Sequence, residues 1–76
     1  MIPVGNHIEI EPIDETTMLI QALSAYQLAT VKQISPDIKV PFKVGDKVYY
    51  VRNKVIVFPE GTLISVDNIE MYKPKI

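Results

Sequence analysis

Cysteine is absent from this 76-residue chain, tryptophan is absent too, and glycine occurs only three times. Without cysteine the protein has no disulfide, no thiolate nucleophile and no cysteine-ligated metal site, a composition that suits a reducing compartment. The three glycines are far apart, so no Gly-rich loop could cradle a phosphate. A single histidine and scattered serines provide no nucleophile with an orienting partner. We therefore expect no catalytic residues and no enzymatic activity.

An excess of charge of one sign is also lacking. Eight basic residues stand against nine acidic ones, the net charge is −1, and the lysines form no cluster. This is not the electrostatic footprint of a DNA- or RNA-binding protein, so no nucleic-acid partner is expected. The tyrosines are therefore expected to be core or subunit-interface aromatics and not a base-stacking platform. They are Tyr26, Tyr49, Tyr50 and Tyr72.

Membrane and export signals are missing as well. The longest stretch without a charge, residues 16–31, is too short and too rich in Gln, Ser and Thr to span a bilayer. The first ten residues have neither a basic region nor a long apolar region, so they do not form a signal peptide. We expect a soluble protein that makes no contact with a membrane.

The sequence consists mainly of short strand patterns separated by turn residues. In residues 7–13 apolar and polar residues alternate, with Ile8 and Ile10 on one face of a half-buried strand that Pro12 ends or places at a sheet edge. Turn residues at Ser35-Pro36-Asp37 and Gly45-Asp46 separate later strand patterns. Those patterns cover residues 28–34, 48–51, 54–58, 63–66 and 69–72. Five or six short strands predict one all-β domain spanning residues 1–76, a small barrel or sandwich.

The interior of this domain is expected to be filled by apolar residues of the strand patterns. They are Ile8, Ile10, Val31, Ile34, Val48, Tyr50, Val55, Val57, Leu63, Val66 and Ile69. On the opposite face of the first strand, His7, Glu9 and Glu11 could in principle hold a metal ion. No second cluster would complete its coordination, so we expect a solvated strand face, no metal site and no cofactor.

Residues 16–28, TTMLIQALSAYQL, do not follow the strand rhythm. Four residues in this segment are spaced at i, i+3, i+4 and i+7, as on one face of a helix. They are Leu19, Ala22, Leu23 and Tyr26. The segment could form one short helical turn, pack into the domain's own core, or serve as a docking loop for another protein.

Four segments follow one another in an order known from a protein family. They are IPVGNHIEIEPID at the start, then ATVKQI, then FKVGDKVYYV with a Val-Gly-Asp-x-Val turn, and finally GTLISVDNIEMY. Together they cover most of the chain, and their succession resembles the GroES co-chaperonin family and the GroES-like barrels of phage proteins. The resemblance implies a small GroES-like β-barrel that forms a homo-oligomer.

The resemblance also implies interaction sites. Met18-Leu19-Ile20 stands where the family carries the hydrophobic tripeptide of its mobile loop, which binds the chaperonin. The implied partner-docking residues are Met18, Leu19, Ile20, Leu23 and Tyr26. Because the terminal strands of GroES-like rings lie between neighbouring subunits, the implied subunit interface contains Val4, Ile69, Met71 and Tyr72.

Two differences from the family bear on function. No glycine or proline occurs from Asp14 to Ser35, and the stretch between Ile34 and Gly45 is too short for the β-hairpin that roofs a co-chaperonin ring. Both favour a non-enzymatic oligomeric structural protein, a phage virion component that decorates or assembles a capsid and contacts capsid subunits. The alternative is a reduced co-chaperonin that caps a chaperonin ring through Met18-Leu19-Ile20. Either hypothesis places the protein in a virion or in the host cytoplasm.

Overall fold

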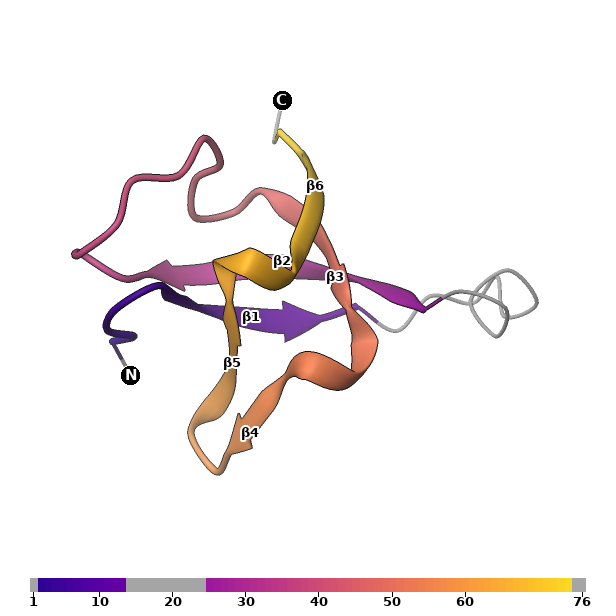
Figure 1. The fold of residues 1–76 in the computed structure, drawn as a ribbon, viewed down its shortest axis with the longest axis horizontal. Helices are drawn as coiled ribbons and strands as arrows, with labels where there is room; N and C mark the ends of the chain where they lie inside the picture. Colours follow the sequence, from indigo (N-terminus) through magenta and orange to yellow (C-terminus); the bar gives the residue numbers. More distant parts are fainter. Residues whose placement is uncertain (1, 14–24, 75–76) are drawn as a thin grey trace.

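The described residues form a single antiparallel β-sheet of six strands in the order β4-β5-β1-β2-β3-β6 (Figure 1). The computed structural model describes residues 2–13 and 25–74. The strands are β1 His7–Pro12, β2 Tyr26–Ile34, β3 Lys47–Val51, β4 Ile56–Phe58, β5 Gly61–Ser65 and β6 Ile69–Lys73. Within the described ranges the only helical elements are two 3-10 turns, η1 Arg52–Lys54 and η2 Val66–Asn68. The predicted all-β fold is confirmed.

Strand β1 is central, with β2 on one side and β5 on the other. Its alternation is as predicted, since Ile8 and Ile10 are buried while His7 and Glu9 are half-buried on the other face. Pro12 is the last residue of the strand. Pro12 pairs with Ala29 of β2, whereas the pairing with β5 stops at Ile10, so this proline ends the strand where it has a neighbour on one side only.

The sheet curls around one apolar core, to which β1, β2, β3 and β5 contribute buried side chains. The buried residues of this core are Ile8, Ile10, Ala29, Val31, Phe42, Val48, Tyr50 and Ile64. Partly buried residues that pack against it include Ile34, Val55, Val66 and Ile69, all of which the sequence placed in the interior. The turn before β3 is as predicted: the Asp46 carboxylate accepts a hydrogen bond from the Lys43 amide at 2.9 Å, and Gly45 has a φ of 97°.

Two residues expected in the core lie elsewhere. Val57 is 74% exposed, and Leu63 is only half-buried, whereas its neighbour Ile64 is fully buried. The reason is the pairing register: Ile64 lies opposite Ile8, so Leu63 lies opposite Glu9 on the outer face. Because adjacent strand residues point to opposite faces, a shift of one residue exchanges core and surface.

The short helical turn considered for residues 16–28 falls mostly on residues 14–24, which lie outside the described residues. Its last part is described, and there Tyr26 to Leu28 are strand β2. Within residues 2–13 and 25–74, no helix has the length and apolar character required to cross a membrane.

Candidate interaction surface

Of the residues predicted to bind a partner, Tyr26 is the one that the structure describes. Met18, Leu19, Ile20 and Leu23 lie outside the described residues. Tyr26 begins β2 and is 42% exposed. The ends of β1 and β2 are tied together beside it, because the Ile13 amide donates to the Leu28 carbonyl at 2.9 Å and the Gln27 side-chain amide donates to the Ile13 carbonyl at 2.6 Å. Tyr26 therefore lies next to a part of β2 that hydrogen bonds hold to the end of β1.

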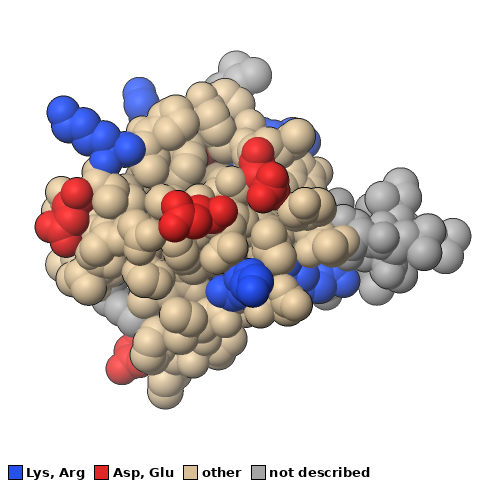
Figure 2. Space-filling view, in the orientation of Figure 1, with Lys and Arg blue, Asp and Glu red and all other residues tan. Residues whose placement is uncertain are grey.

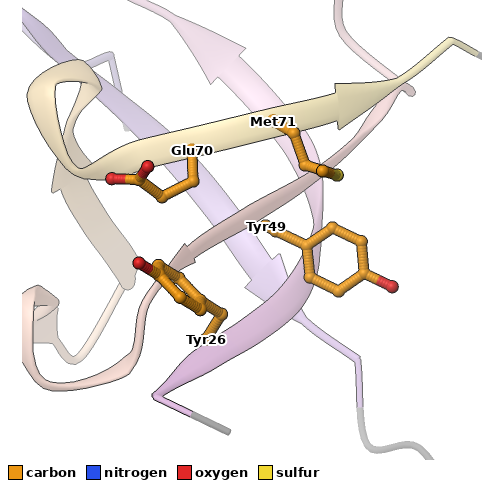
Figure 3. A pocket seen from close by; sticks show the side chains of 4 residues that line it. All are labelled: Tyr26, Tyr49, Glu70 and Met71. Atoms are coloured by element: carbon orange, nitrogen blue, oxygen red, sulfur yellow. The ribbon is translucent and has the colours of Figure 1, made fainter.

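Tyr26 lines a hollow of about 520 Å³ together with residues of two further strands. Tyr49 of β3 and both Glu70 and Met71 of β6 complete the lining (Figure 3). Tyr49 is paired with Met71 across the β3–β6 ladder, and Tyr49 is also paired with Leu28 of β2. Figure 3 shows the Glu70 carboxylate on the side of the Tyr26 hydroxyl, with Met71 on the side of Tyr49. The hollow is thus mostly aromatic and apolar, with one carboxylate at one end.

Glu70 reaches this hollow because of an irregularity in β6. In the β3–β6 ladder Tyr49 is opposite Met71 and Tyr50 is opposite Ile69, which leaves Glu70 without a partner residue in β3. Such a bulge bends the strand and redirects side chains. Consecutive residues of β6, Glu70 and Met71, can therefore line the same hollow.

A second hollow, of about 320 Å³, lies along β6 and contains the remaining β6 residues of the predicted interface. Tyr72 packs against Phe42 there, with ring centroids 5.9 Å apart and an interplanar angle of 55°. Ile69 also lines it and is partly buried against the core. Because Glu70 and Met71 line both hollows, the two form one continuous surface along β6. We call it the β6 surface, defined by Tyr26, Tyr49, Glu70, Met71 and Tyr72.

Strand β6 is also an edge strand, since in the described sheet it pairs only with β3. Its other side offers backbone amides and carbonyls that no strand of the described sheet pairs. Met71 is 59% exposed beside this edge. Unpaired backbone groups next to exposed apolar side chains are a typical site for protein association.

Val4, the remaining residue of the predicted interface, does not belong to the β6 surface. It precedes β1, which is separated from β6 by β2 and β3 in the sheet. Its carbonyl accepts from the His7 amide at 3.4 Å, and the neighbouring Gly5 amide donates to the Asp37 carboxylate at 3.0 Å. Val4 and Ile2 are both largely exposed. The structure therefore brings Tyr26, Met71 and Tyr72 onto the β6 surface and leaves Val4 outside both of its hollows.

A smaller hollow, of about 240 Å³, lies along β1 and has Glu9, Glu11 and Lys32 among its lining residues. In the described ranges no group of three or more His, Asp or Glu residues is arranged to hold a metal ion. Glu11 instead forms an ion pair with Lys32, with the Lys32 Nζ and Glu11 Oε1 atoms 3.6 Å apart. Figure 2 shows acidic and basic side chains interspersed across the visible face of the molecule, without an extended patch of one sign.

Sequence reasoning found most of the β6 surface but missed Glu70. Tyr49 was expected only as a core or interface aromatic, and nothing in the sequence marks Glu70 as the bulged residue, because a bulge arises from the pairing of two distant strands. Comparison with models of known families, with curated proteins and with solved structures finds no match to this chain.

Proposed function

We propose that the protein is a non-enzymatic structural protein whose copies associate through the β6 surface. The observation that carries the proposal is an open edge strand flanked by exposed apolar side chains, with Met71 at its centre. Fully burying a side chain of this size contributes roughly 1.5–3 kcal/mol before the costs of association are subtracted. A contact along the whole strand would add backbone hydrogen bonds to this gain.

The partner surface in this proposal is the N-terminal segment of the next copy. Ile2 and Val4 are exposed and apolar and line neither hollow of the β6 surface, so one molecule carries two different surfaces that need covering. A contact between two different surfaces of identical subunits repeats from copy to copy and gives a ring or a filament. The GroES resemblance of the sequence supports a ring, since it implies the same pairing of the two ends of the chain.

The finer assignment that we propose is a phage virion component that decorates or assembles a capsid and contacts capsid subunits. The segment between β2 and β3, residues 35–46, contains no strand and therefore no roof hairpin of the kind a co-chaperonin carries. This supports the structural role over the co-chaperonin role, which would use Met18-Leu19-Ile20, outside the described residues. Absence of the protein from purified particles of its phage would contradict the virion assignment.

The association is tested by measuring molar mass in solution. The wild-type protein should form a species of several times the 8.6 kDa chain mass. Met71→Lys and Val4→Lys should each abolish this species, because a lysine ammonium would be buried against an apolar surface. Both residues are exposed, so neither change should unfold the protein.

A matched control is Val44→Lys, since Val44 is 59% exposed like Met71 but lies in the turn before β3. This variant should keep the wild-type mass. The proposal is wrong if the wild-type protein shows no species larger than two copies, or if Met71→Lys leaves the large species intact.

A further inference from the structure

Strand β4 is the second free edge of the described sheet, and each of its residues is at least 42% exposed. It pairs only with β5, and all three of its residues are exposed and apolar. Ile56 and Phe58 lie on one face and Val57 on the other. An edge strand of this kind is a known hazard that proteins usually blunt with charge or cover with a partner. The β6 contact proposed above does not involve it.

The turn after β4 determines which backbone groups face outward. Phe58 and Gly61 are paired and enclose the two-residue turn Pro59-Glu60, so they form the hydrogen-bonded pair that closes the hairpin. Hydrogen-bonding direction alternates along a strand, so Val57 directs its amide and its carbonyl away from β5. Val55 and Pro59 face the same way, but Pro59 has no amide hydrogen to donate.

We propose that two copies of the protein pair β4 against β4, antiparallel, about a two-fold axis at Val57. In this register the two Val57 residues exchange two backbone hydrogen bonds. Ile56 of each copy then lies opposite Phe58 of the other, as a directly facing cross-strand pair. All three exposed side chains of β4 acquire an apolar neighbour.

Charge supports this occupant and this register. Lys54, the last residue of η1, precedes β4, and Glu60 lies in the turn that follows it. With Val57 at the axis, Lys54 of one copy therefore lies at the same end of the paired strands as Glu60 of the other, and symmetry repeats the pair. Both residues are exposed in the single chain. A register with Val57 opposite Val55 of the other copy would place Lys54 opposite Phe58. A register with Val57 opposite Pro59 would lose a hydrogen bond, because proline has no amide hydrogen. β4 and the residues that flank it thus carry complementary apolar and charged groups for a second copy, as a two-fold contact requires.

The pairing is tested in the Met71→Lys background, so that its outcome does not depend on the β6 contact. Sedimentation over a range of concentrations should give a monomer–dimer equilibrium between 8.6 kDa and twice this mass. Adding Val57→Lys should raise the dimer dissociation constant at least tenfold, because it places two ammonium groups face to face. Val57→Pro should also raise the dimer dissociation constant, because it removes the amide that each copy donates at the two-fold axis. It should remove no hydrogen bond to β5.

Val44→Lys in the same background is the matched control and should leave the dimer unchanged. The register is tested by charge reversal: Lys54→Glu and Glu60→Lys should each weaken the dimer, and the double variant should restore it. The proposal is overturned if the Met71→Lys protein stays monomeric at concentrations approaching millimolar. It is equally overturned if Val57→Lys leaves the dimer intact, or if the double reversal fails to restore what the single reversals lose.

Discussion

Tyr50 is the tyrosine of β3 that points into the core, and only 3% of its surface is exposed. Its neighbours in the strand, Tyr49 and Val51, point to the outer face and are half-buried. Burial raises the pKa of the Tyr50 hydroxyl above its ordinary value of 10.0, because the interior disfavours the phenolate, while the nearby Arg52 guanidinium offsets part of this rise in the pKa. The hydroxyl therefore stays neutral in the folded protein at a pH where an unfolded chain ionises it.

This raised pKa predicts a loss of stability in alkali. The neutral Tyr50 hydroxyl contributes fully to the free energy of unfolding below the pKa of an unfolded tyrosine, about 10. This contribution is lost as the pH rises above that value toward the pKa in the folded protein. The free energy of unfolding should therefore fall between pH 9 and pH 11, as measured by urea titration at each pH. Tyr50→Phe should flatten this fall, since phenylalanine fills the same site without ionising. An equally steep fall in the variant would assign the effect to other groups.

Strand β5 illustrates what a sequence pattern can and cannot determine at the level of elements. The strict alternation of β1 and the Gly45-Asp46 turn were predictable, because each depends on neighbouring residues alone. The choice between Leu63 and Ile64 for the core was not, because both are apolar and the register with β1 decides. Phe42 was not predicted as a core residue for a related reason, since it lies in a segment without strand or helix periodicity. The β6 bulge likewise depends on the pairing of distant strands.

The two neighbouring residues of β5 provide a direct test of the register. Ile64→Ala should lower the free energy of unfolding by about 2–5 kcal/mol, since it removes fully buried methyl and methylene groups and leaves a cavity. Leu63→Ala should cost distinctly less, because Leu63 is half-buried on the outer face. Denaturant titration of both variants measures the difference. A larger loss for Leu63→Ala would mean that β5 is paired one residue out of this register.

At the scale of the whole molecule, the protein combines a small core with two uncovered sheet edges. A domain of about 60 residues buries only about 60% of the surface that its unfolded chain exposes, and this 76-residue chain is little larger. The described sheet ends in β4 on one side and β6 on the other, and both carry exposed apolar residues. Association at these edges would add to a modest intrinsic stability.

The thermal midpoint should therefore depend on protein concentration. Because only folded chains associate, a higher protein concentration should raise the thermal midpoint by mass action. Scanning calorimetry at concentrations a hundredfold apart should show this rise for the wild-type protein. The rise should vanish in a Met71→Lys, Val57→Lys double variant, which lacks both proposed contacts. Identical midpoints for the wild-type protein at all concentrations would argue against association of any kind.

The central position of β1 has a consequence for how the protein is made. Its second neighbour, β5, is separated from it in the chain by β2, β3 and β4, so a chain emerging from the ribosome presents one side of β1 unpaired until most of its residues have been synthesised. Contacts this distant in sequence also slow folding. During synthesis, one of the two middle strands of the sheet therefore exposes backbone groups that the finished fold pairs.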